Sequence, residues 1–231
     1  MLSWTYAQIK AKVLADLGLE QEEFVTDSEL MGYCNEAIDE AEAEIHTIYE
    51  DYFLKPASIN LVAGTNLYAI PTDIYANKIR KVLYYENNTN YYPVLRLKHN
   101  EQFLDILETN ANNTDQNYRY MLINMDAATG FQLQLIPASR ITLTGGLVIW
   151  YIRNANRIVA ETDVCDIPEF VSFVLQWMKM RCYEKEGNPM LPTAIQMLDQ
   201  QRNQMISTLT NKIDDGENEI EKDLDIYENM V

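Results

Sequence analysis

The sequence predicts an α+β protein, built as a discontinuous helical bundle with an inserted antiparallel β subdomain. Helix signals occupy both ends of the chain, and the middle alternates short apolar runs with turn residues. The two helical ends cannot bury their apolar stripes alone, so we expect them to pack together and to carry the insert on one side. The expected organisation is a bundle from residues 1–56 and 160–214, a β-rich insert at residues 57–159 and an acidic C-terminal tail at residues 215–231.

The first helix is predicted from Tyr6 to Leu17. Ser3 or Thr5 can accept hydrogen bonds from the amides of the first turn, and Gly18 suits the left-handed position that ends a helix. The apolar residues recur at four-residue steps, which place them on one helix face. They are Ile9, Val13 and Leu17.

The second helix has the clearest start in the chain. Thr26 and Glu29 fit a capping box, in which the hydroxyl accepts from the Glu29 amide and the Glu29 side chain reaches back. Pro56 is expected to end the helix, because proline disfavours helical geometry in the residue before it. The apolar face keeps three- and four-residue steps and consists of Leu30, Cys34, Ala37, Ala41, Ile45, Ile48 and Tyr52.

The insert is predicted to consist of strands joined by turns. Apolar residues alternate with glutamines from Phe131 to Leu135, so one face of that strand is expected to be buried and the other wet. Asn100 is expected to cap a short helix at residues 101–107, and Gly145-Gly146 marks a bulge or a break. The predicted strands are residues 57–62, 67–70, 78–85, 91–98, 118–125, 131–136 and 141–152.

The second helical part starts at Asp166, with Pro168 in the first turn and Glu169 three residues on. The helix that follows is apolar on two faces, which indicates a central helix surrounded by protein. A last helix is predicted from Thr193 to Ile213, and after Gly216 the charge density predicts a frayed or extended tail. The inward residues of the last helix are expected to be Ile195, Leu198, Met205 and Leu209.

The chain is strongly and unevenly acidic. Its formal net charge is −17, and no lysine or arginine occurs between Lys12 and Lys55. The C-terminal residues from Asp214 onward are also acidic, with Lys222 as the one base. Such a surface repels phosphate, which argues against ordinary nucleic-acid binding. A solvated face that keeps the protein soluble is the simplest reading of this charge.

Composition also bounds the class of protein. A chain of 231 residues can bury a core without a disulfide or metal staple. The longest apolar run, from Leu147 to Ile152, is far shorter than the roughly 20 residues that span a bilayer, so no membrane is expected. Lys10 and Lys12 interrupt any early apolar run that could serve as a signal peptide. The cysteines are odd in number and widely spaced, which suggests reduced thiols in a cytosolic protein.

No constellation of catalytic or cofactor-binding residues emerges from the sequence. His46 and His99 have no partner at metal-ligand spacing, and the chain contains no phosphate-binding glycine motif or nucleophile elbow. Cys34 and Cys182 fall on apolar helix faces, where cysteine acts as a small hydrophobe. Paired carboxylates are abundant, but without a confining apolar pocket they indicate solvated charge. We therefore expect no enzyme activity, no metal and no cofactor.

Tyrosine is unusually frequent in the insert. Two readings stay open: the residues fill half-buried strand positions, or they form a protein interface, where tyrosine is enriched. The tyrosines are Tyr84, Tyr85, Tyr91, Tyr92, Tyr118 and Tyr120.

The order of these elements resembles the head-to-tail adaptor (connector) proteins of tailed bacteriophages. The resemblance rests on the capped helix Thr26 to Ala37, the Tyr-x-Ile-Pro-x-Asp segment Tyr68 to Asp73, and the Asp-Ile-Pro-Glu-Phe segment Asp166 to Phe170. It implies a homo-oligomeric ring, usually of twelve subunits, which docks under the portal, extends the DNA channel and offers a platform to the tail. The expected location is the virion head–tail junction, after assembly in the host cytoplasm.

Particular residues can carry these implied roles. The acids Glu36, Asp39, Glu40 and Glu44 of the second helix are candidate channel-lining residues, because an acidic wall lets DNA pass without binding it. The tail can fold on the portal protein through Leu224, Ile226 and Tyr227. Tyr91 and Tyr92, beside a hairpin turn, are candidates for contact with tail or neck proteins or a neighbouring subunit.

Two other functions remain open from the sequence. A tail-completion or stopper protein lower in the neck would differ only in its partner. An acidic DNA mimic that inhibits a nucleic-acid enzyme would explain the second helix and would leave the large sheet unexplained.

Overall fold

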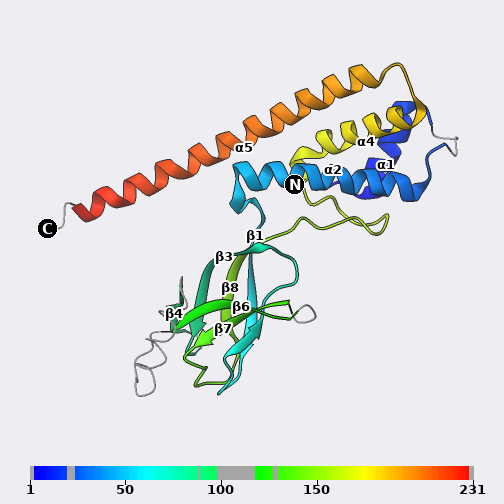
Figure 1. Cartoon of the computed structure of the whole chain (residues 1–231). Coiled ribbons are helices and arrows are strands. Elements are labelled where there is room, and N and C mark those ends of the chain that lie inside the picture. The colour runs from blue at the N-terminus through cyan, green and yellow to red at the C-terminus, as the bar shows by residue number, and fades with distance from the viewer. Residues whose placement is uncertain (1–2, 20–23, 88, 98–117, 127–129, 229–231) are drawn as a thin grey trace. The chain divides into compact units, whose positions relative to one another are not determined.

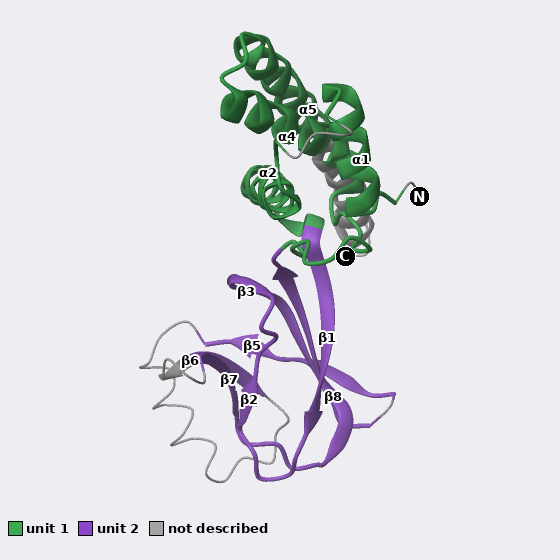
Figure 2. Ribbon diagram, turned by 90° about the vertical axis from the view of Figure 1, so that its right-hand side faces the viewer, with its two compact units in different colours: residues 1–52, 155–231 green, residues 53–154 purple. Residues whose placement is uncertain are grey.

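The structure, a computed structural model, describes residues 3–19, 24–87, 89–97, 118–126 and 130–228 (Figure 1). The described residues combine helices with largely antiparallel sheets, so the predicted α+β class is confirmed. They form two compact units: residues 1–52 with 155–231, called the helical unit, and residues 53–154, called the β unit (Figure 2). The helix expected at residues 101–107 lies outside the described residues.

Helices α1 (Tyr6–Leu17) and α2 (Asp27–Ile48) begin as predicted, each with a capping box. The Thr5 hydroxyl accepts from the Gln8 amide, and the Thr26 hydroxyl accepts from the Glu29 amide. In each case the side chain of the third helical residue accepts from the capping residue's own amide. Gly18 ends α1 at a φ of +67°, a left-handed conformation that glycine adopts without strain.

The end of α2 differs from the prediction. The helix stops at Ile48, where Tyr49 leaves helical geometry, and the short 3₁₀ helix η1 (Glu50–Phe53) follows. Pro56 does not end the helix; it lies inside β1 (Leu54–Leu61). This strand is at the edge of its sheet, the position in which a strand tolerates proline.

Helix α4 (Val171–Glu186) follows the 3₁₀ turn η2 (Pro168–Phe170) and packs against the other three helices of the helical unit. Separate side chains of α4 reach each neighbour: Lys179 pairs with Asp16 of α1, and Arg181 pairs with Glu36 of α2. The Gln176 side chain donates to the Ala194 carbonyl of α5 at 3.1 Å. Helix α4 is therefore central, as its two apolar faces predicted.

Helix α5 (Leu191–Glu228) corrects two expectations. Leu198, Met205 and Leu209 are buried, but the Ile195 side chain is 45% exposed, because it lies one residue off this buried stripe. The backbone after Gly216 continues as helix instead of an extended tail. Glutamate favours helix, and Ile220, Leu224 and Tyr227 recur at helical spacing, which outweighs one glycine.

The β unit contains two four-stranded sheets with the orders β1-β8-β3-β4 and β2-β7-β6-β5. Neighbouring strands are antiparallel, except that the short β5 runs parallel to β6. The other strands are β2 (Leu67–Ala69), β3 (Ile74–Tyr85), β4 (Tyr91–Pro93), β5 (Leu95–Arg96), β6 (Arg119–Asp126), β7 (Gly130–Ile136) and β8 (Leu143–Arg153).

Strand β3 begins at Ile74, four residues before the predicted start. Ala76 and Asn77 take left-handed backbone angles, with φ of 46° and 56°, and the pairing with β8 shifts register between Ile74 and Ile79. A β-bulge of this kind lets one strand continue through a local irregularity. Residues such as Asn77 are typical of turns, so the sequence did not indicate that the strand already begins at Ile74.

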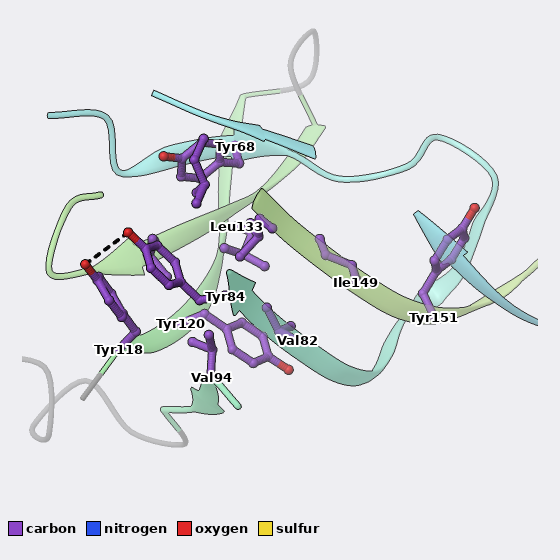
Figure 3. Packing of buried hydrophobic residues seen from close by; sticks show 12 residues of the cluster. Tyr68, Val82, Tyr84, Val94, Tyr118, Tyr120, Leu133, Ile149 and Tyr151 are labelled. Carbon is purple, nitrogen blue, oxygen red and sulfur yellow. Dashed lines mark hydrogen bonds between the residues drawn. The ribbon is translucent and has the colours of Figure 1, made fainter. Parts of the chain in front are cut away.

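Buried aromatic and aliphatic side chains form the core of the β unit (Figure 3). The rings of Tyr84 and Tyr118 stack with their centroids 4.0 Å apart, and the Tyr118 hydroxyl donates to the Tyr84 hydroxyl. Gly146 in β8 allows a close approach, because a Cβ built there would lie 2.6 Å from Leu61 Cδ1. The pairing of β1 with β8 also shifts register across the glycine pair, from Ile59–Leu147 to Leu61–Leu143, so the predicted bulge is confirmed and the strand continues through it.

Candidate interaction surfaces

Ion pairs within the chain hold three of the four acids predicted to line a channel. Glu36 receives a hydrogen bond from Arg181 Nε of α4 at 2.9 Å. Asp39 pairs with Arg157 in the segment after β8, and Glu44 pairs with Arg202 of α5. The structure thus places these acids along α2 and neutralises much of the charge that the sequence displays.

Glu40 differs from the other three acids. Glu40 is exposed, and within the described residues no ion pair joins its carboxylate to a lysine or arginine. It borders a small cavity of about 40 Å³ between α2, α4 and α5, together with Glu44 and Arg202. Glu40 is therefore the member of the predicted set that keeps an unshared charge at the surface.

Glu42 is a buried acid that sequence reasoning did not single out. Only 6% of the residue is exposed, and its carboxylate accepts from the Ala155 amide at 2.8 Å and from Arg157 Nη2 at 3.3 Å. Burial opposes ionisation, but the neighbouring His46 ring, the hydrogen bond from the Ala155 amide and the charge of Arg157 outweigh it and hold the Glu42 pKa below its usual value. Four-residue spacing from Cys34 and Ile38 was the signal that could have placed Glu42 on the buried face.

Asn35 adds a second anchor for the same segment. Its side chain donates to the Ile158 carbonyl and accepts from the Ile158 amide. The segment from Ala155 to Ile158, which follows β8, is therefore fixed to α2 at two points by buried or half-buried polar groups.

The histidines and cysteines show no ligand geometry in the part of the chain that is described. His46 is buried with its Nε2 3.4 Å from Glu42 Oε1, and His99 lies outside the described residues. No group of three or more potential metal ligands occurs among the described residues. The three cysteines are buried and unpaired with one another as disulfides, and burial raises the pKa of Cys34 to about 12 and of Cys182 to about 11. Such thiols are poor nucleophiles.

The tyrosines of the insert divide between the two readings. Tyr84, Tyr118 and Tyr120 are buried in the core of the β unit. Tyr91 is 54% exposed and its ring lies 5.4 Å from that of Tyr85, while the half-buried Tyr92 donates its hydroxyl to Glu86 at 3.1 Å. Both Tyr91 and Tyr92 lie on β4, an edge strand of its sheet.

The predicted tail anchors Leu224, Ile226 and Tyr227 lie in the last turns of α5. Their backbone is helical, and their side chains lie outside the described residues. The last buried side chain described on α5 is Leu209, so the helix continues for about five turns past that contact. Figure 1 shows this continuation past the start of α4, because the two helices run in opposite directions.

A groove of about 310 Å³ lies on the outer face of α1. Ala7, Ala11 and Leu14 form its apolar part, with Lys10 and Glu161 beside them. Lys10 Nζ lies 2.7 Å from Asp27 Oδ1 and 3.1 Å from Glu161 Oε1, so the polar groups at the groove satisfy one another. The described residues contain no helix that is long and apolar enough to cross a membrane.

Comparison with known proteins gives one family. The family model described as SU10 adaptor protein matches residues 4–220, which spans both units. A search of curated proteins gave no match.

Proposed function

This chain belongs to the SU10 adaptor protein family, and we propose that it forms the head-to-tail adaptor ring of a tailed bacteriophage. In this proposal the ring docks under the portal protein, extends the DNA channel and provides a platform for tail or neck proteins. It is a structural virion component, with about twelve copies assembled from subunits in the host cytoplasm. The family match over residues 4–220 is the observation that carries the proposal.

The mechanism is positional, and we propose no catalysis or cofactor. Many identical copies align one channel with the next, and repeated weak contacts add up to a stable assembly. The buried thiols and the mutually paired polar groups are compatible with a structural role.

Helix α2 is our proposed channel face, through Glu36, Asp39, Glu40 and Glu44. The helix contains seven acids and no lysine or arginine, and partners from other segments offset only part of that charge. The remaining negative charge, with Glu40 as its exposed member, would repel the phosphate backbone and let DNA pass without specific binding.

The outer end of α5 is our proposed portal contact. A helix of 38 residues extends for about 57 Å, whereas the 16 residues of α4 extend for about 24 Å. The surplus length is an arm that can reach a partner, with Leu224, Ile226 and Tyr227 as apolar anchors on an acidic background. For the opposite partner, we propose Tyr91 and Tyr92 on β4 as contacts with the tail or a neighbouring subunit, since tyrosine is enriched at interfaces.

Native mass spectrometry tests the proposal, with the full chain measured alone and mixed with the portal protein of the same phage. A high-mass ring that forms alone or on the portal, at a defined copy number, is the expected result. A chain that stays a monomer in both conditions would overturn the proposal. Binding to a different neck protein, without portal binding, would instead favour a stopper position.

A further inference from the structure

We infer that neighbouring copies in the ring contact each other through two different surfaces of the helical unit: the α1 groove of one copy and the α4–α5 corner of the next. The α1 groove is the cavity beside Ala7, Lys10, Ala11, Leu14 and Glu161. The α4–α5 corner is the surface that carries Met190, in the turn between the two helices, and Met197, seven residues later. This inference rests on the proposed ring and identifies which parts of the chain build it.

The first support is the distribution of exposed apolar side chains. In the described part of the helical unit, four of the six most exposed large hydrophobic residues fall into two pairs. Val159 and Val164, 78% and 50% exposed, lie in the segment that borders the start of α1, where Thr5 pairs with Val164. Met190 and Met197, both 50% exposed, are seven residues apart, so they lie on the same side of the start of α5. Exposed apolar clusters of this kind mark interaction sites.

The second support is shape. One surface is a recess and the other is a helical corner with two methionines. Methionine is unbranched and adaptable, so it fills irregular apolar cavities well. The polar side chains described at the groove pair with each other, since Lys10 is shared between Asp27 and Glu161, so they are not directed at a small polar ligand. An apolar side chain from a protein partner therefore suits the groove better than a metabolite does.

The third support is charge. Every copy carries a net charge of −17, so copies repel one another unless they meet where charge is low. Helix α2 contains seven acids without a lysine or arginine, but α1 carries Lys10 and Lys12 against Asp16. Residues 191–213 carry Arg202 and Lys212 against Asp199. The two proposed contact surfaces thus lie on α1 and on the first part of α5, which lack the excess of acids that α2 carries.

The fourth support is position. A closed ring needs a heterologous interface, in which each copy uses two different surfaces. Helix α4 meets α1 through Lys179 and α5 through Gln176, so the two proposed surfaces belong to different helices, each held by the central helix. With α1 and α5 occupied by neighbours, α2 keeps a separate face of the unit, the face proposed for the channel.

Single charge insertions test this assignment. Ala11→Glu fills the recess, and Met197→Glu places a charge on the corner; both residues are exposed, so the fold is expected to survive. Ala15→Glu on α1 and Ser207→Glu on α5 are matched controls, since they add the same charge at other exposed positions of the same helices. Circular dichroism and thermal unfolding establish that each variant is folded.

The readout is native mass spectrometry, alone and with the portal protein. We expect the controls to form rings like the parent chain. In each test variant, the fraction of chains found in rings should be at least ten-fold lower than in the parent. A mixture of the Ala11→Glu and Met197→Glu chains has one intact pair of surfaces, so it should stop at a 1:1 dimer.

The outcomes separate this inference from the proposed function. Rings formed normally by both test variants would overturn the interface and leave the adaptor function standing. A mixture that yields no dimer, while each variant has lost its rings, would also overturn the assignment of paired surfaces. A parent chain that never assembles would overturn the ring itself.

Discussion

Asn35 and Ile158 lie 123 positions apart and exchange two hydrogen bonds. Asn35 Nδ2 donates to the Ile158 carbonyl at 2.9 Å, and the Ile158 amide donates to Asn35 Oδ1 at 2.8 Å. Residues around Ile158 belong to no helix or strand, and the Asn35 side chain satisfies both backbone groups of Ile158, as a neighbouring strand would. Together with Glu42, it fixes the chain to α2 directly after the β unit ends.

Replacing this amide should destabilise the helical unit. Asn35→Ala leaves two half-buried backbone groups without partners, so the free energy of unfolding should fall by roughly 2–3 kcal/mol. Urea unfolding followed by circular dichroism measures the change. Asn203→Ala, at an exposed position of α5, is the control and should change stability by less than about 0.5 kcal/mol. Equal stability of the two variants would show that the double hydrogen bond contributes little.

Acid should weaken the chain through Glu29. Hydrogen bonds from Lys185 and then from Thr26 hold the pKa of Glu29 at about 2, below its ordinary value of 4.5. A carboxyl group with a depressed pKa stabilises the folded state at any pH above its ordinary pKa of 4.5. This stabilisation is lost as the pH falls from about 4.5 to about 2. Glu29→Gln should therefore lower stability at pH 6 and show a smaller further loss between pH 5 and pH 3. The urea concentration at half-unfolding, measured at these pH values, reports the stability. Glu40→Gln is a control on the same helix. If Glu29→Gln lost as much stability as the parent chain between pH 5 and pH 3, the prediction would be contradicted.

Gly146 should not tolerate a methyl group. A Cβ at this position would lie 2.6 Å from Leu61 Cδ1 and 3.0 Å from Leu143 Cβ, so Gly146→Ala should cost about 1–3 kcal/mol through overpacking. Gly32 in α2 is the matched control, because a Cβ there meets no atom within 4 Å. Gly32→Ala should stabilise the helix by about 0.5–1 kcal/mol. Thermal unfolding of both variants gives the comparison, and shifts of the same sign would refute it.

Deleting residues 215–231 should abolish portal docking and leave the fold intact. Among the side chains of α5 that the structure describes, the buried ones precede the deleted segment: Ala194, Leu198, Met205 and Leu209. Circular dichroism and thermal unfolding report the fold, and pull-down with the portal protein reports docking. A folded, truncated chain that still binds the portal as strongly would sink the proposed role of Leu224, Ile226 and Tyr227.

Alanine at both Tyr91 and Tyr92 should weaken attachment of tail proteins or contact between subunits. Because Tyr91 is 54% exposed and β4 is an edge strand, most of the loss should appear in binding and not in folding. Co-sedimentation of assembled rings with tail proteins measures the effect, and Tyr120→Ala in the buried core is a contrasting variant that should mainly destabilise the β unit. Unchanged rings and unchanged tail binding would remove these tyrosines from the proposed interface.

Local chemistry made parts of this fold predictable. The starts of α1 and α2 follow from capping boxes at Thr5 and Thr26, whose donors and acceptors lie within three residues of each other. The central position of α4 follows from its two apolar faces, because a helix that is apolar on most sides must be covered. The sequence resemblance to phage adaptors agrees with the family match over residues 4–220.

Other features depend on partners that are distant in the sequence. Local signals placed the end of α2 at Pro56, although the chain leaves the helix at Tyr49 to enter β1, and they ended the last helix before Gly216, although α5 continues to Glu228. The acids of α2 look like an unshared negative surface in the sequence. Arg157, Arg181 and Arg202 reach them only in the folded chain.

The sequence by itself therefore determined the fold class, the starts of α1 and α2 and the family, since these depend on short-range spacing and on the order of elements. Tertiary structure alone decided which charges are shared, which tyrosines are exposed and where the apolar surfaces of the helical unit lie. The physical reason is that an ion pair or a buried contact is set by distance in space, and the helical unit is assembled from two segments separated by about a hundred residues of β unit.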